Sequence, residues 1–144
     1  MNETVDMNLY INASEVKEGY TIQVKRNGTV LKEGVGYTLA KTGERYRVRV
    51  MMNADKMCDV ISVQLLDANG QPVYPARALS IRNYAQLRLV NTKAPDMEKR
   101  LIIAMLDYGA LSQLCVDSNA TDLANRYVTD ADRALFEGFE YPTW

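Results

Sequence analysis

The stretch Met97–Cys115, MEKRLIIAMLDYGALSQLC, decides how the rest of the chain is interpreted. Its apolar residues recur at intervals of three and four, at Met97, Leu101, Ala104, Tyr108, Leu111 and Cys115. This spacing places them on one side of an α-helix. Further apolar positions widen that side, at Ile102, Met105, Leu106 and Gly109, whereas Asp107 and Gln113 lie elsewhere on the helix. We therefore expect a largely buried core helix, packed on more than one side, rather than the wall of a cofactor pocket.

The ends and the interior of this helix carry their own signals. Pro95 suits a first helical turn, where a missing N–H costs little, and Thr92 or Asn91 is the expected cap. Gly109 costs about 1 kcal/mol relative to alanine in a helix interior. Its presence predicts either a bend or the close approach of another backbone.

Length and composition describe an ordinary globular chain. The 144 residues suffice for one domain with a hydrophobic core, and the net charge of -1 gives no electrostatic case for binding nucleic acid. Neither an apolar run of membrane-spanning length nor a basic segment followed by an apolar one occurs. The sequence therefore predicts no membrane insertion and no signal peptide within this chain.

Histidine is absent, and cysteine is scarce. Without histidine, Ser-His-Asp catalysis, Cys-His catalysis and histidine-based metal sites are excluded. We expect Cys58 and Cys115 to be two separate buried thiols, with a disulfide as the alternative if the fold brings them together. No cofactor and no metal site is predicted.

The N-terminal half reads as antiparallel strands. Apolar and polar residues alternate with period two, most clearly over 44–52, where Arg45, Arg47 and Arg49 face away from Tyr46, Val48, Val50 and Met52. Asn27-Gly28 is a strong hairpin signal. The expected strands cover residues 5–12, 20–25, 29–34, 37–40, 44–52, 60–66 and 73–79, the last at an edge because of Pro72 and Pro75.

From Ser80, a plausible helix cap, the apolar period changes to that of helices. The sequence predicts an α+β fold: an antiparallel sheet or sandwich over about residues 5–79, covered by a C-terminal helical hairpin over about 80–115. A helical turn over 121–127, a short helix capped near Thr129 that ends by Phe136, and an extended tail over 137–144 would follow. We interpret residues 1–144 as a single domain with a subdomain border near Ser80.

Several short motifs follow one another in the second half. They are SIRNYA at 80–85, AMLDYGA at 104–110 with Gln113, and TDLAN at 121–125. This series resembles an accessory module of large secreted and cell-surface proteins of gut-dwelling Gram-positive anaerobes, in which it often reads SVRDYA, AMLNYGAAAQ and TDNLAN. The chain departs from that pattern at Asn83, Asp107 and Leu114-Cys115.

The resemblance implies an exported module inside a longer multidomain protein, with an extracellular or cell-surface location and flanking domains as partners. It brings no known catalytic residues, so no catalytic site is assigned. The matching Tyr84, Tyr108 and Gly109 are interpreted as packing residues.

The most pointed surface feature is the row Arg45, Arg47 and Arg49, with Lys25 expected near it. Together with Tyr10 these residues form the candidate binding site, for a glycan, an acidic cell-wall polymer or an acidic protein. The alternative is a solvated sheet face with cross-strand ion pairs. Tyr37 and Tyr74 are also expected to point outward.

Pairs of carboxylates at Asp55/Asp59 and Asp130/Asp132, and the Asp67–Gly70 turn, are expected to be surface, capping and turn residues rather than catalytic or calcium sites. We expect a non-catalytic structural or interaction module, with carbohydrate binding as the alternative and a stand-alone enzyme as the least favoured interpretation.

Overall fold

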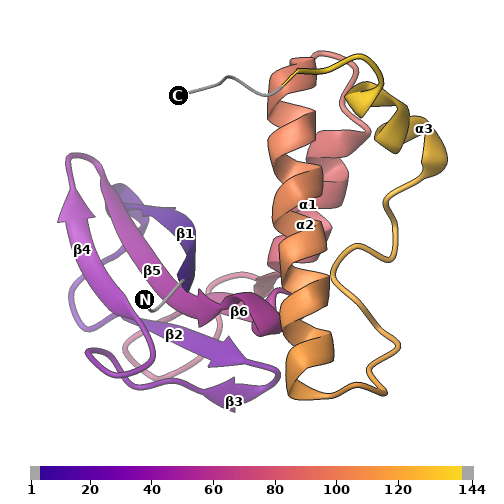
Figure 1. Cartoon of the computed structure of the whole chain (residues 1–144). Coiled ribbons are helices and arrows are strands. Elements are labelled where there is room, and N and C mark those ends of the chain that lie inside the picture. The colour runs from indigo at the N-terminus through magenta and orange to yellow at the C-terminus, as the bar shows by residue number, and fades with distance from the viewer. Residues whose placement is uncertain (1–3, 141–144) are drawn as a thin grey trace. The chain divides into compact units, whose positions relative to one another are not determined.

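The computed structural model describes residues 4–140, which form a mixed α+β fold of two antiparallel sheets and three α-helices (Figure 1). These residues group into two compact units. Unit 1 comprises the described residues up to Asn53 together with Asp59–Ser80. Unit 2 comprises Ala54–Cys58 and the described residues from Ile81 onward. The last of the three crossings between units, from Ser80 to Ile81, therefore falls where the apolar period changes.

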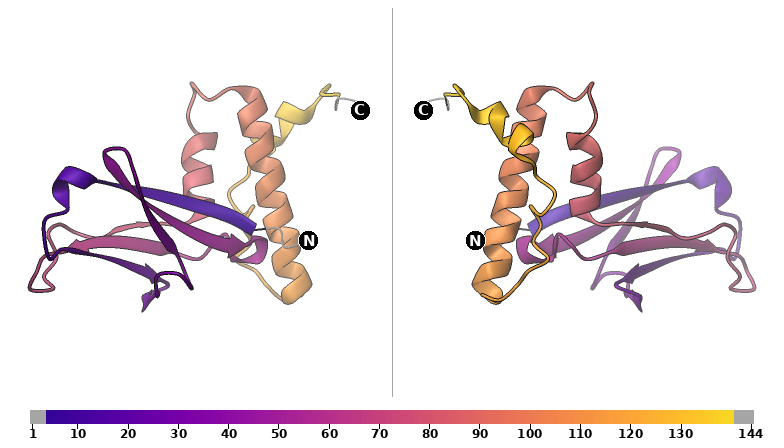
Figure 2. Two further views of the ribbon diagram at one scale, coloured as in Figure 1. Left: turned by 90° about the vertical axis from the view of Figure 1, so that its left-hand side faces the viewer. Right: turned by 90° about the vertical axis from the view of Figure 1, so that its right-hand side faces the viewer.

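Unit 1 contains the strands and one short 3-10 turn, η1 (Ala13–Glu15). One sheet has the order β1-β5-β4 and the other the order β3-β2-β6-β7, and Figure 2 shows them as two layers. The strands are β1 (Thr4–Asn12), β2 (Thr21–Arg26), β3 (Thr29–Val30), β4 (Thr38–Thr42), β5 (Arg45–Asn53), β6 (Ile61–Leu66) and β7 (Arg77–Leu79).

The predicted alternation is confirmed in the burial of these strands. The apolar set of β5 is inward, with Val48, Val50 and Met52 buried, while its arginines lie on the opposite face. The other sheet buries Val24 of β2 and Ile61, Val63 and Leu65 of β6. Apolar residues at every second position thus give each sheet one buried face.

Turn chemistry also follows the sequence. Asn27 and Gly28 both have positive φ, 48° and 84°, as a tight two-residue hairpin requires. The Asn27 side chain accepts a hydrogen bond from the backbone N–H of Val60 at 2.9 Å, which ties the hairpin to the start of β6. β7 is an edge strand, as the flanking prolines predicted, but it is only three residues long.

Unit 2 is built on the helices. They are the 3-10 turn η2 (Ala54–Lys56), α1 (Ile81–Leu89), α2 (Asp96–Val116), α3 (Asp130–Arg133) and the 3-10 turn η3 (Ala134–Phe136). α1 and α2 lie side by side, and Arg88 of α1 pairs with Glu98 of α2 at 2.7 Å (Figure 1). Of the helices within residues 4–140, none offers an apolar segment able to cross a bilayer.

The predicted orientation of α2 is wrong. Ile103, Leu106, Gly109 and Ala110 are its buried residues, on the side of the helix opposite the stripe expected in the core. Every residue of that expected stripe is exposed. The buried side contacts η2. The sequence predicted only a loop in this region, but Ala54 and Met57 there are buried.

Of the smaller predictions in unit 2, some are confirmed and others are wrong. The N-cap of α2 is Pro95 rather than Thr92 or Asn91, and the Asn91 side chain instead accepts from the N–H of Lys93. Thr129 caps α3 as expected, in a reciprocal capping box with Asp132. Residues 124–127 form a turn and not a helical segment. Of the predicted tail, 141–144 lie outside the described residues.

Candidate functional site

The outward face of the β1-β5-β4 sheet brings together four of the five residues predicted as a binding site. Arg45, Arg47 and Arg49 alternate along the central strand β5. The antiparallel register places Tyr10 of β1 directly opposite Arg47. The Tyr10 side of this face is open, since 49% of Tyr10 is exposed. An exposed ring beside a guanidinium is therefore present in unit 1.

Lys25 does not join this row. It lies on β2, in the other sheet, opposite Ser62 of β6 and Val30 of β3. The expectation that Tyr37 points outward is wrong because Tyr37 is buried, and its burial raises the pKa of its hydroxyl. Tyr74 is half-buried and lies below the guanidinium of Arg77, 5.8 Å from the ring centre.

Arg49 and Arg47 differ in whether their guanidinium groups have hydrogen-bond partners. Arg49 is paired with Asp6 of β1, donating from Nε at 2.9 Å, so one cross-strand ion pair of the solvated-face alternative is present. Arg47 is different, because its Nε is buried and has no acceptor among residues 4–140. A buried guanidinium N–H without an acceptor is an unsatisfied donor within the sheet face, and a ligand on the surface cannot reach it.

A polar cleft of about 430 Å³ opens at the Arg45 end of the row. Its walls come from the end of β1, from η1 and from the turn between β4 and β5, and they consist of Asn12, Ala13, Ser14, Lys41, Gly43, Glu44 and Arg45. Because Asn12 and Arg45 are direct cross-strand partners, the cleft continues the face that carries Tyr10 and Arg47. Hydroxyl, amide and charged groups of both signs line it.

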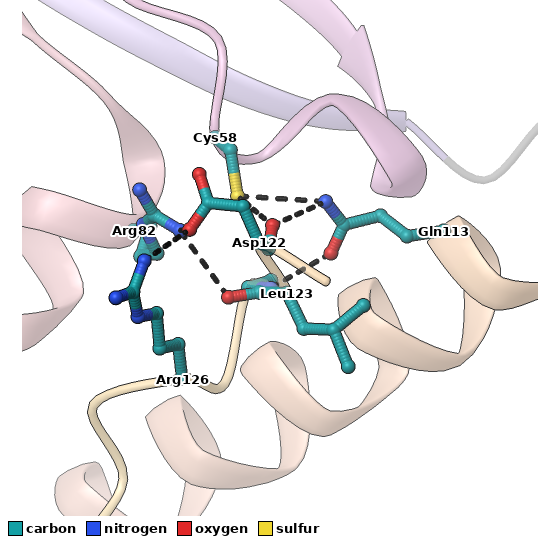
Figure 3. Close-up of polar contacts among 7 residues, drawn as sticks. Cys58, Arg82, Gln113, Asp122, Leu123 and Arg126 are labelled. Carbon is teal, nitrogen blue, oxygen red and sulfur yellow. Dashed lines mark hydrogen bonds and ion pairs between the residues drawn. The ribbon is translucent and has the colours of Figure 1, made fainter. Parts of the chain in front are cut away.

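A second polar cluster lies in unit 2 and joins the motifs that carry the family resemblance (Figure 3). Arg82, from the first motif, donates to the Asp122 carboxylate at 2.6 Å and to the Leu123 carbonyl at 3.3 Å, both in the third motif. Its guanidinium also lies 5.4 Å from the ring centre of Tyr127. The side chain is only 13% exposed, and the hydrogen bond from Arg82 lowers the pKa of the Asp122 carboxyl.

Gln113 connects α2 to the same loop. Its Oε1 accepts from the backbone N–H of Ala124 at 2.7 Å, and its Nε2 donates to the Asp122 carbonyl at 3.2 Å. The Cys58 thiol lies beside both groups, with Sγ 3.5 Å from the Gln113 Nε2 and 3.5 Å from the Asp122 carbonyl (Figure 3). Cys58 and Cys115 are not joined in a disulfide, as predicted, but the predicted burial is wrong for Cys115, which is exposed, while Cys58 is half-buried.

Asp107 ties α2 to the C-terminal segment. It accepts from Asn125 at 2.8 Å and from both terminal nitrogens of Arg133 at 2.9 Å. The hydrogen bonds from Arg133 are the main cause that lowers the pKa of the Asp107 carboxyl. The departure from the family pattern at position 107 thus places a carboxylate where the arginine of α3 can pair with it.

Gly109 marks the closest packing in unit 2. A Cβ at this position would lie 2.6 Å from the Met57 sulfur, 3.1 Å from the Ala124 Cβ and 3.2 Å from the Ala54 carbonyl oxygen. The prediction of a close approach is therefore confirmed, and α2 runs unbroken through the glycine. Only a residue without a side chain lets the η2 backbone come this near.

Sequence reasoning missed the unit 2 cluster, although it quoted the motifs that form it. The available signal was that Gln113 lies on the side of the helix away from the regular stripe, while Asp107 flanks the stripe. Polar residues with local backbone partners on that side indicate contact with another segment rather than solvent.

Three of the other acidic candidates have partners within the chain. Asp59 pairs with Arg26 at 2.7 Å, Asp132 completes the α3 capping box, and the Asp67 side chain accepts from the N–H groups of Asn69 and Gln71. In the part of the chain described, no group of three or more acidic or cysteine side chains is placed to hold a metal ion.

Comparison of the chain with protein-family models, with curated proteins and with solved structures finds no match. The two clusters themselves are therefore the features from which a function can be inferred.

Proposed function

We propose that the chain is a non-catalytic interaction module of a larger exported bacterial protein. The observation that carries this proposal is the way the motif residues use their polar groups. Arg82 and Gln113, which come from two separate motifs, both donate hydrogen bonds to Asp122 in a third. Side chains that bind one another in this way stabilise the fold and are not available to a ligand. The exposed face of unit 1 is then the surface left for binding.

The carboxylates support the absence of catalysis in this proposal. Glycosidases hold two carboxyl groups at a set separation around a substrate. Asp107 and Asp122 have pKa values lowered by arginine partners, which suits permanent ionisation and not a proton donor. A glycosidase of this kind would use a carboxyl group with a raised pKa as its general acid.

A carbohydrate ligand is the second candidate, and a specific observation favours it. The open ring of Tyr10 stands opposite Arg47, and the polar cleft at Asn12 and Arg45 extends the same face. An aromatic ring offers an apolar platform for a sugar ring, and guanidinium groups donate paired hydrogen bonds to carboxylates of acidic glycans. An acidic cell-wall polymer presents the same chemistry.

A glycan array probed with the full chain, followed by calorimetric titration of the strongest hit, tests this candidate. We expect binding of acidic glycans that Tyr10→Ala or Arg47→Ala weakens at least tenfold. Lys25→Ala is the matched control, because it removes a predicted cation that lies in the other sheet. A ligand lost equally in all three variants, or no ligand on the array, would exclude this face as a glycan site.

The extracellular location and the partnership with flanking domains are proposed on the motif resemblance. Detection of the chain on intact cells with an antibody, compared with lysed cells, tests the location. The parent gene tests the flanking domains. A chain detected only after lysis would contradict the proposal.

The covering of an antiparallel sandwich by a helical hairpin also stays a proposal. Its test is a fragment that ends at Leu79. That fragment keeps Ala54 and Met57 but loses α2, against which η2 packs, so we expect it to aggregate or to unfold without cooperativity. A monomeric fragment with a cooperative melting transition would overturn the prediction.

A further inference from the structure

The outward side of α2 carries a second apolar stripe that unit 2 does not bury. This outward stripe consists of Met97, Leu101, Ala104, Tyr108, Leu111 and Cys115. Leu101 is 70% exposed, Leu111 62% and Met97 58%. It is the most regular apolar pattern in the chain, and it lies opposite the side that contains Ile103, Leu106 and Ala110.

The spacing of the outward stripe is that of a coiled-coil seam. Successive members are separated by four, three, four, three and four residues, which is the a/d pattern of a heptad repeat. Such a stripe drifts little around the helix and matches another helix that carries the same spacing. The partner it specifies is therefore a helix, not a sheet or a small molecule.

We propose that the outward stripe pairs antiparallel with the same stripe of a second copy of this chain. In that pairing Met97 meets Cys115, Leu101 meets Leu111, and Ala104 meets Tyr108, so every layer is filled and the smallest side chain faces the largest. A parallel pair would place Ala104 on Ala104 and Tyr108 on Tyr108, leaving a gap beside an overfilled layer. Facing large with small is how packed helices reach the density of protein interiors.

The charged residues beside the stripe do not oppose pairing. Glu98 is bound to Arg88, and Asp107 to Arg133, within each chain. On the Asp107 side, Arg100 donates to the Leu135 carbonyl at 2.6 Å and lies 4.2 Å from the ring centre of Phe139. Each flanking charge thus has a partner in its own chain, so two copies approach without an unpaired like charge.

The size of the seam sets the expected strength. Nineteen residues of helix extend about 28 Å, and at a helix width of about 10 Å the seam covers roughly 300 Å² per chain. This lies well below the ~800 Å² per partner of a standard interface, so we expect a weak, transient dimer that forms only at high protein concentration. The pairing goes beyond the proposed binding function and does not depend on a glycan.

Sedimentation velocity of the full chain across a concentration series is the first test. We expect a shift from monomer to dimer with rising concentration. Leu101→Glu places a charge in the seam and should weaken dimerisation at least tenfold. Val35→Glu is the matched control, since Val35 is 81% exposed and lies in unit 1, and it should dimerise as the parent does.

Disulfide trapping determines whether the two helices pair antiparallel or parallel, and it leaves Leu101 unchanged. In a Cys58→Ser background, Met97→Cys should form disulfides to the native Cys115 of the second copy when oxidised glutathione is added. Without Met97→Cys, the two Cys115 residues lie at opposite ends of the seam, and no covalent dimer should form.

Three results would overturn the proposal. One is a chain that stays monomeric at every concentration. Another is a Cys115–Cys115 disulfide that forms faster than the cross-link between Met97→Cys and Cys115, because an antiparallel pair holds the two Cys115 thiols apart. The third is a melting temperature of the monomer that Leu101→Glu lowers by several degrees, because the stripe would then be covered within its own chain.

Discussion

The two sides of α2 differ in a way that their composition does not suggest. The outward side is regular and apolar, from Met97 to Cys115, yet it is exposed. The buried side mixes Ile103 and Leu106 with Gly109 and Gln113. Burial on this helix therefore follows the fit of a specific neighbour, and regular apolar spacing alone does not identify the core.

The neighbours explain the buried side. η2 comes within contact of α2 because Gly109 has no side chain, and the 122–124 loop is held because Gln113 satisfies its backbone groups. Close packing and paired polar groups favour this side by combining dispersion with satisfied hydrogen bonds. The outward side offers only apolar area, which any helix with the same spacing can cover.

The largest expected effect comes from the buried side. Ile103 is 0% exposed, and Ile103→Ala removes several methyl and methylene groups from a close-packed site. We expect a loss of about 2–5 kcal/mol in the free energy of unfolding. Chemical denaturation monitored by circular dichroism measures it. A loss below about 1 kcal/mol would mean that this side is not the packed one.

Next in size is the loss of the Gln113 side chain. Gln113→Ala leaves the Ala124 N–H and the Asp122 carbonyl without this partner, and an unsatisfied part-buried group costs about 1–3 kcal/mol. Ser112→Ala on the neighbouring position is the control. Equal effects in the two variants would contradict the role of Gln113 as the connection to the loop.

Gly109→Ala tests the close approach. The added Cβ would meet the Met57 sulfur at 2.6 Å and the Ala54 carbonyl at 3.2 Å. Overpacking costs about 1–3 kcal/mol, and the helix propensity of alanine returns about 1 kcal/mol. We expect a net loss of about 1 kcal/mol that becomes smaller in a Met57→Ala background. A stabilised Gly109→Ala variant would show that η2 lies farther from the helix.

How far the sequence predicts this structure differs between the units. In β5, Arg45, Arg47 and Arg49 alternate strictly with apolar residues, so only one side of the strand can face the core. The strand itself, its outward face and the presence of Tyr10 on that face could therefore be predicted. Lys25 was misplaced because the assignment of β2 to the other sheet depends on pairing with β6, where its partner Ser62 is thirty-seven residues away. Long-range pairing leaves no local trace in the sequence.

In α2 the helix itself was predictable but its orientation was not. Both sides are apolar enough to be buried, so periodicity cannot choose between them. The choice depends on residues 54–57, which lie between two predicted strands, and on residues 121–125, which were expected to form a helical turn. The unit 2 cluster was missed for the same reason, since Asp122 and Arg82 meet only after those segments pack.

Lowering the pH should destabilise the folded chain slightly, because Asp107 becomes protonated. The pKa of Asp107 is lowered in the folded chain, so its stabilisation is complete above the ordinary carboxyl pKa of about 3.9 and is lost as the pH falls through the folded value. Both partners are partly exposed, so we expect a contribution of at most about 1 kcal/mol. Denaturation at pH 7 and pH 3 measures it, and Asp107→Asn should lose less on acidification than the parent chain. An unchanged pH dependence in Asp107→Asn would contradict the assignment.

The smallest expected effect tests the comparison most directly. Leu101 belongs to the outward stripe and is 70% exposed, so Leu101→Ala removes methyl groups that already contact water. At a concentration where the chain is monomeric, we expect a change within about 0.5 kcal/mol, as for other surface substitutions. The same denaturation assay used for Ile103→Ala gives both numbers on one scale. If Leu101→Ala costs as much as Ile103→Ala in the monomer, the two sides of α2 are equally buried in solution and the difference between them is lost; if it costs more only at concentrations where two chains associate, the outward stripe is exposed within the chain and covered by its second copy.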